Sequence, residues 1–165
     1  MAHFRLRRRW LSYTLLAVAP TTEPPPPQSL RRLEHEYSLA AELEPAWAAK
    51  PLALTRHEGR TILFLADPGG EPLDLVLEQG REQPLDLARF LRLAINLATA
   101  LGHVHQRGLI HKDVKPEHVL VGDAGQVWLT GFGFASRLHE SARRPRRRRS
   151  LPARLPTWRP NRPGA

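Results

Sequence analysis

A long apolar periodicity in the second half of the chain constrains the fold more than any other sequence feature. Within residues 85–106, apolar side chains recur at three- and four-residue spacing. They form one broad stripe made of Leu87, Phe90, Leu91, Ala94, Leu97, Ala98, Leu101 and Val104. Gly108 follows as a stop signal. The pattern therefore predicts an amphipathic helix that buries one face in a core.

Two short strands are predicted directly after this helix and its loop. Residues 118–121 and 126–129 read HVLV and QVWL and are mostly apolar, and the turn 122–125 separates them. Further upstream, residues 61–65 read TILFL and predict a buried strand. The Asp-Pro-Gly-Gly run that begins at Asp67 predicts a turn or a hinge after that strand.

The N-terminal third carries weaker signals. Residues 13–19 predict a strand, although the arginine cluster and apolar stretch before residue 20 are also compatible with a signal peptide. The proline run 24–27 predicts an extended connector that is not helical. A helix is expected after it, with Ser29 as its N-cap and Leu30, Leu33, Tyr37, Ala40 and Ala41 on its apolar face.

Charge is distributed unevenly along the 165 residues, whose net charge is +9. Residues 137–165 hold ten arginines and one acidic residue, whereas residues 1–136 hold equal numbers of basic and acidic residues. A neutral body does not indicate nucleic-acid binding. The chain has no cysteine, and no stretch is long and apolar enough to span a membrane. We therefore expect a cytoplasmic protein without a membrane or nucleic-acid partner.

Two motifs flank the predicted strand pair, one before it and one after it. Residues 111–118 read HKDVKPEH, and residues 131–133 read GFG. The pair resembles the His-Arg-Asp-Leu-Lys-Pro-x-Asn loop and the Asp-Phe-Gly motif of protein kinases, at the spacing found there. More narrowly, the phrases RLEHEYSL, PLALTRHEGRT and LTGFGFASRL resemble the N-terminal kinase-like domain of large bacterial sensor histidine kinases.

The resemblance implies an α+β, two-lobed protein kinase-like fold with an incomplete N-terminal lobe and a truncated C-terminal lobe. It also implies a division of the chain into four parts. These are a basic segment (1–12), a partial N-lobe with the hinge (13–79), a partial C-lobe with both motifs (80–138) and a disordered basic tail (139–165).

The resemblance assigns roles to matching positions. Asp113 takes the place of the catalytic base, and Lys115 that of the lysine beside the transferred phosphoryl group. Glu36 takes the place of the glutamate that pairs with the ATP-binding lysine. The segment around Asp67 takes the place of the hinge that meets adenine.

Several departures from the kinase pattern weigh against catalysis. Residues 15–19 contain no lysine, and no glycine-rich phosphate loop precedes them. His118 and Gly131 replace the two metal-binding residues, although magnesium prefers oxygen ligands. We therefore expect weak ATP binding at most, with Glu36, Asp67, His118 and Gly131 at the nucleotide site, and no magnesium or other metal site.

Three functions remain open on the sequence alone. The first is a pseudokinase module that acts by binding other domains or proteins of a sensor kinase system. The second is an active serine/threonine kinase, and the third is a non-functional remnant. Simpler roles are also open for single residues: Asp113 and His111 as props of the loop, His118 as a polar filler, Glu36 as a solvated side chain, and Phe132 as part of the core.

The arginine-rich tail predicts a frameshift. Residues 149–164 read RSLPARLPTWRPNRPG, and permitted codons for them, read one base earlier, encode EVIAGTLAYMAPEQTG. That segment matches the Gly-Thr-x-x-Tyr-Met-Ala-Pro-Glu run that follows Asp-Phe-Gly in kinases. We therefore expect a change of reading frame between about residues 138 and 148, real or from sequencing error.

Overall fold

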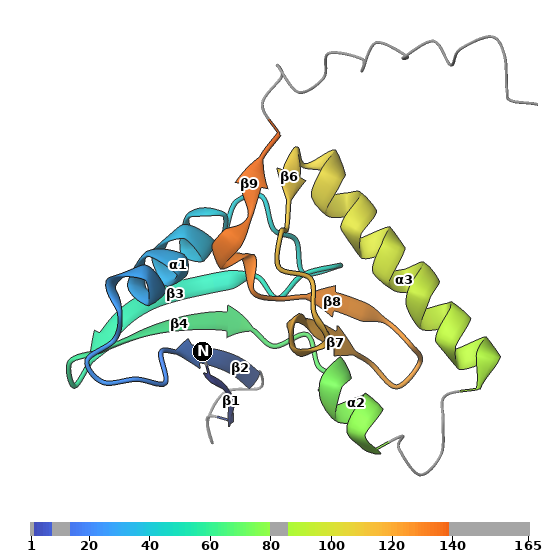
Figure 1. Cartoon of the computed structure of the whole chain (residues 1–165), viewed down its shortest axis with the longest axis horizontal. Coiled ribbons are helices and arrows are strands. Elements are labelled where there is room, and N and C mark those ends of the chain that lie inside the picture. Colours follow the sequence, from blue (N-terminus) through green and yellow to red (C-terminus); the bar gives the residue numbers. More distant parts are fainter. Residues whose placement is uncertain (1, 8–13, 80–85, 139–165) are drawn as a thin grey trace, which may run out of the picture.

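The computed structural model describes residues 2–7, 14–79 and 86–138, and Figure 1 shows their arrangement. The N-terminal part is a four-stranded sheet in the order β1-β2-β4-β3, with every pair antiparallel. Its strands are β1 (Ala2–Arg7), β2 (Thr14–Ala19), β3 (Pro51–His57) and β4 (Arg60–Ala66). The predicted strands 13–19 and 61–65 correspond to β2 and β4.

Neither β1 nor β3 was predicted from the sequence. The arginines of β1 obscure its alternation, and the strand forms because it pairs with β2 over its whole length, from Ala2 opposite Ala19 to Arg7 opposite Thr14. β3 has only one fully buried residue, Pro51. Both strands are therefore specified by pairing with a neighbour, which a local pattern does not reveal.

The first helix, α1 (Pro27–Ser38), begins earlier than predicted. Pro27 lies inside it, and Ser29 is not its N-cap, because Pro26 holds that position without a side-chain hydrogen bond. Both expectations were wrong for the same reason. The first helical position needs no backbone N–H, so a proline with its fixed φ fits there well.

Residues 67–70 connect the sheet to the rest of the chain as the predicted turn. Gly69 and Gly70 both have positive φ, of 87° and 79°. A Cβ on Gly70 would lie 2.6 Å from the carbonyl oxygen of Val121, so this approach also requires glycine. The turn leads into β5 (Glu71–Pro72) and the short helix α2 (Leu73–Gln79).

The predicted long helix is α3 (Leu87–Gln106), which ends just before Gly108 as expected. The Asp86 side chain caps it by accepting a hydrogen bond of 2.7 Å from the Arg89 backbone N–H. The predicted apolar stripe is only partly correct. Its members Leu97, Leu101 and Val104 pack on the core, together with Leu93 and Ala100, which the stripe did not include. The remaining predicted positions are exposed: Leu87, Phe90, Leu91, Ala94 and Ala98.

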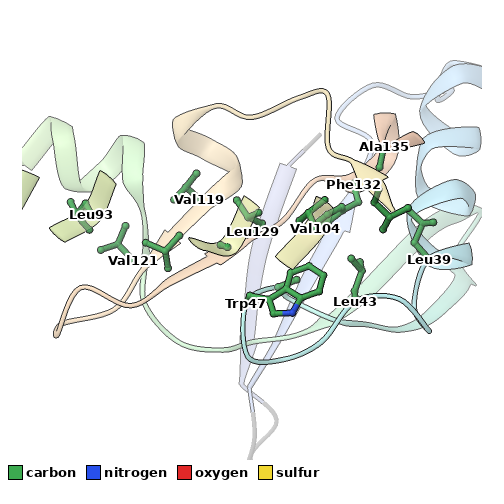
Figure 2. Close-up of a cluster of buried hydrophobic side chains, with 14 residues drawn as sticks. Leu39, Leu43, Trp47, Leu93, Val104, Val119, Val121, Leu129, Phe132 and Ala135 are labelled. Carbon is green, nitrogen blue, oxygen red and sulfur yellow. The ribbon is translucent and has the colours of Figure 1, made fainter. Parts of the chain in front are cut away.

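The hairpin β7 (Val119–Val121) and β8 (Val127–Leu129) lies between α1 and α3 (Figure 1). β5 pairs with β7, and the two-residue strands β6 (Leu109–Ile110) and β9 (Ser136–Arg137) pair with each other. Figure 2 shows the larger core cluster, where Trp47, Leu129 and Phe132 lie among side chains from α3 and the hairpin. A second cluster joins β2 and β4 to Leu33 of α1.

The mixed helix and sheet architecture expected from the sequence is confirmed. None of the helices in the described ranges is long and apolar enough to cross a membrane. The predicted disordered tail at 139–165 lies outside the described residues, as do Arg8 and Arg9 of the N-terminal arginine cluster.

Candidate functional site: a cleft between α1 and the 111–118 loop

His111 organises the loop that carries the first motif. It is 1 % exposed, and its Nε2 donates a hydrogen bond of 2.8 Å to the carbonyl oxygen of Thr130. Its Nδ1 accepts a weaker bond of 3.3 Å from the Asp113 backbone N–H. Burial lowers the pKa of His111, which favours the neutral ring that these two bonds require. Lys112 between them has a φ of 66°, so the loop makes a sharp turn here.

The Asp113 side chain faces Lys115 and His118. Its Oδ2 lies 3.8 Å from Lys115 Nζ and 3.4 Å from His118 Nδ1. The Asp113 side chain keeps 29 % of its surface exposed, so it remains accessible from the cleft. Its backbone carbonyl also accepts a bond of 2.9 Å from His118 Nδ1. Asp113 is thus both part of the loop framework and available to a ligand.

His118 packs directly against Gly131. A Cβ built on Gly131 would lie 2.5 Å from His118 Nδ1 and 2.6 Å from its Cγ and Cε1. These separations are far below van der Waals contact, and His118 is only 7 % exposed. Gly131 also adopts the left-handed region, with φ 75°. The imidazole therefore fills the space that any side chain at position 131 would need.

Glu36 is buried, which corrects the interpretation that it is solvated. Only 4 % of it is exposed, and its Oε1 accepts a hydrogen bond of 3.1 Å from the Gly131 backbone N–H. Burial raises the pKa of its carboxyl from 4.5 to about 7, although hydrogen bonds from the backbone N–H groups of Phe132 and Gly131 act in the opposite direction. Two backbone donors thus take the place of a cationic partner.

Two further contacts join α1 to residues 131–135. His35 Nε2 donates a hydrogen bond of 2.8 Å to the Ala135 carbonyl. The Arg32 guanidinium carbon lies 4.0 Å from the centroid of the Phe134 ring. Phe132, at the centre of this segment, is fully buried and belongs to the core as expected. The helix and the second motif are therefore held together at three places.

The cleft between these elements has a volume of about 580 Å³. It brings together five predicted site residues, namely Glu36, Asp113, Lys115, His118 and Gly131. Asp67 is not among its lining residues, and the Asp67 carboxylate accepts a bond of 3.0 Å from the Gly69 N–H in the turn. Among the described residues, no three histidine, aspartate or glutamate side chains are grouped so that they could hold a metal ion.

Three charged residues of the cleft were not predicted from the sequence. Arg32 comes from α1, Asp74 from the start of α2, and Glu117 from the 3-10 helix Pro116–His118. Asp74 and Arg32 carry no motif signal. Glu117, however, lies inside the first motif, and its place between Pro116 and His118 could have suggested a position at the cleft.

Comparison with known proteins agrees with this geometry. Residues 32–152 match the family model described as protein kinase domain. The chain is 31% identical over 113 residues to the serine/threonine-protein kinase WARTS homolog of Caenorhabditis elegans, covering 67% of this chain and 12% of that protein. It is 35% identical over 92 residues to the serine/threonine-protein kinase PKH3 of Saccharomyces cerevisiae, covering 54% of this chain and 10% of that protein.

A human serine/threonine-protein kinase is also similar to this chain. The chain is 32% identical over 103 residues to serine/threonine-protein kinase LATS1 of Homo sapiens, covering 61% of this chain and 9% of that protein. The fold and the matched region define a protein kinase domain. The chain belongs to the protein kinase family. It spans about a tenth of the length of each relative named here.

Proposed function

We propose that this chain is a pseudokinase module: a kinase-fold domain that acts by binding and does not transfer the ATP γ-phosphate with magnesium. One observation carries the proposal, namely that the His118 ring fills the space beside Gly131. In the kinase pattern these two positions supply metal ligands. Here one is an imidazole that magnesium disfavours, and the other has no side chain.

The packing of His118, and not only the residue types at positions 118 and 131, disfavours a metal ion there. Aspartate tolerates the left-handed backbone of position 131 better than most residues do. The contact with His118, rather than the backbone angle, is therefore what excludes a carboxylate there. Since phosphoryl transfer depends on neutralising phosphate charge, Asp113 alone is insufficient for catalysis. Any ATP binding would therefore depend on contacts with the side chains that line the cleft.

The burial of Glu36 supports the same conclusion. β2 contains no lysine, and Glu36 is bonded to backbone N–H groups of the second motif. The carboxylate that would orient a phosphate-binding lysine is thus committed to holding α1 against residues 131–135. This arrangement is compatible with a domain that a partner recognises by its conformation and that does not need to catalyse phosphoryl transfer.

The partner we propose is another domain or protein of a bacterial sensor kinase system. Two of the three phrases that resemble such sensors, RLEHEYSL and LTGFGFASRL, lie in α1 and around the second motif. These segments contact each other through Glu36, His35 and Arg32. The third phrase, PLALTRHEGRT, lies in β3 and β4. The contact between the other two phrases supports a role for α1 and residues 129–138 in signalling.

One observation favours the alternative of an active serine/threonine kinase. Asp113 and Lys115 face the same cleft, 3.8 Å apart, at the positions of a catalytic base and a phosphoryl-binding lysine. Proton transfer by such a base contributes typically about 10²- to 10⁴-fold to a rate. The two hypotheses differ in whether ATP turns over.

A labelling experiment separates them. The chain is incubated with γ-labelled ATP, magnesium or manganese, and a generic protein substrate, and we expect no transfer of label. Transfer that disappears in Asp113→Asn would establish the active kinase and end the pseudokinase proposal.

A reversion experiment tests whether His118 and Gly131 are the cause of the missing magnesium binding. The double variant His118→Asn with Gly131→Asp should show magnesium-dependent thermal stabilisation in the presence of ATP, because it restores oxygen ligands and removes the clash. The wild type and Gly131→Asp alone should show none. Magnesium-dependent stabilisation of the wild type would contradict the proposed misfit.

A further inference from the structure

One face of α3 is apolar and remains exposed. The inner side of the helix packs against β6 and β8, and its outer side forms an edge of the molecule (Figure 1). Four large apolar side chains of the helix are between 48 % and 72 % exposed, namely Leu87, Phe90, Leu91 and Ile95. Contiguous exposed apolar side chains of this kind mark interaction surfaces in proteins.

The exposed face carries no charge. α3 has no acidic residue, and its two arginines, at positions 89 and 92, line a pocket beside the turn at residues 122–125. The helical period of 3.6 residues turns both arginines away from the apolar face. Two copies of this face can therefore approach each other without repulsion between like charges.

Large and small residues divide the face into two halves. The large side chains lie towards its N-terminal end, and small residues follow at four-residue spacing, namely Ala94, Ala98 and Gly102. Together with Leu87, Leu91 and Ile95 they fall within an arc of about 100° on the helix surface. A Cβ on Gly102 would have no neighbouring atom within 4 Å. Glycine destabilises a helix relative to alanine, and packing within the described residues does not require it here.

An antiparallel pair of α3 helices sets each large residue of the face opposite a small one. With a two-fold axis between residues 94 and 95, the pairs across the two copies are Leu87 with Gly102, Leu91 with Ala98, and Ile95 with Ala94. Two-fold symmetry makes each of these contacts twice, once in each direction. A parallel pair would instead set leucine against leucine and leave voids at the small residues.

The apolar surface is large enough for such a pair. The exposed apolar residues of the face, counted on both copies, amount to roughly 1,000 Å², which is the size at which specific protein interfaces begin. We propose that two copies of this chain associate through α3 as an antiparallel, two-fold symmetric helix pair. None of the cleft-lining residues belongs to α3, so this proposal is independent of the pseudokinase proposal.

Exchanging a large and a small residue tests the pairing. In sedimentation equilibrium of the full chain we expect monomers and dimers and no larger species. Ala98→Leu should weaken the dimer about ten-fold or more because it collides with Leu91 of the other copy. Leu91→Ala should also weaken it, because it leaves a cavity. The double variant Leu91→Ala with Ala98→Leu sets large against small again and should recover most of the wild-type affinity.

These variants distinguish a specific pair from general stickiness. Non-specific association of apolar surfaces would be strengthened by Ala98→Leu, because that variant exposes more apolar surface. Leu52→Ala is the control, since Leu52 of β3 and Leu91 are equally exposed, at 48 % each, and it should leave the dimer unchanged. Both positions of the exchange are exposed in the single chain. Circular dichroism and urea unfolding of the variants at low concentration should therefore match the wild type.

Disulfide trapping tests the helix direction, and the chain has no cysteine of its own to interfere. A mixture of Leu91→Cys and Ala98→Cys chains should form a disulfide-linked dimer under mild oxidation. Leu91→Cys alone should not, because the two copies of position 91 would lie roughly 10 Å apart along the helix axis, beyond the reach of a disulfide.

Three results would each overturn the proposal and leave the pseudokinase proposal intact. The first is a monomer at all concentrations, which would mean that something other than a second copy covers this face. The second is equal or tighter association of Ala98→Leu. The third is efficient cross-linking of Leu91→Cys with itself, which would indicate a parallel pair.

Discussion

Glu36 should make the stability of the domain depend on pH in a way that one substitution removes. Its folded-state pKa is about 7, compared with 4.5 when the carboxyl is unperturbed. Between these values the folded chain retains a proton that the unfolded chain has lost. The contribution of Glu36 to the free energy of unfolding is therefore largest below about pH 4.5, falls as the pH rises to about 7, and is constant above that.

The magnitude follows from the size of the shift. Each pKa unit corresponds to about 1.36 kcal/mol, so Glu36 should lower the free energy of unfolding by about 3 kcal/mol between pH 4.5 and 8. Glu36→Gln cannot ionise, and its amide oxygen can still accept the hydrogen bond from the Gly131 N–H. We therefore expect this variant to be more stable than the wild type at pH 8 and close to it at pH 5.

Urea unfolding, followed by tryptophan fluorescence, measures the effect, because Trp47 is buried in the core. The informative quantity is the difference between wild type and Glu36→Gln at each pH, because every other ionisable group is present in both proteins. Glu34→Gln, an exposed position on the same helix, is the control and should leave the pH dependence unchanged. Parallel wild-type and Glu36→Gln curves would show that the two backbone donors keep Glu36 ionised, and the reasoning from burial would be wrong.

Three other predictions follow from the structure and the sequence. Gly131→Ala should lower the free energy of unfolding by about 1–3 kcal/mol through its clash with His118, and adding His118→Ala should recover part of the loss; additive effects in urea unfolding would exclude the contact. The exposed apolar side chains Phe90 and Ile95 of α3 should cause concentration-dependent association in sedimentation experiments, and Phe90→Glu with Ile95→Glu should reduce it; unchanged association would place its origin elsewhere. The gene should encode a Tyr-Met-Ala-Pro-Glu segment in the other frame opposite residues 156–161, and its absence would mean that the tail is not out-of-frame sequence.

Sequence patterns predicted those elements whose signals are local. Gly108 follows α3 as expected, and the turn at residues 122–125 separates β7 from β8 almost where expected. The exposed half of the α3 stripe could not be predicted, because periodicity shows that a helix has an apolar face but not how much of it is covered. α2 was missed because seven residues are too short for a clear helical period.

The candidate site shows the same limit. The two motifs led to Asp113, Lys115, His118 and Gly131, which do line one cleft. The burial of Glu36 was not predictable, because its hydrogen-bond donor Gly131 lies 95 residues away along the chain. The contact of His118 with Gly131 could have been predicted from the sequence. Both residues replace metal-binding residues of the kinase pattern, and those two positions lie close together in kinases.

The packing of His118 on Gly131 also constrains how this chain could change over evolutionary time. A lineage that regained an aspartate at position 131 first would pass through an intermediate in which the new side chain overlaps the imidazole. A lineage that replaced His118 first would lose its bond to the Asp113 carbonyl and gain nothing at once. Each single step thus disturbs a contact of His118. The effect of a substitution at either position depends on the residue at the other, so the two positions are coupled in evolution.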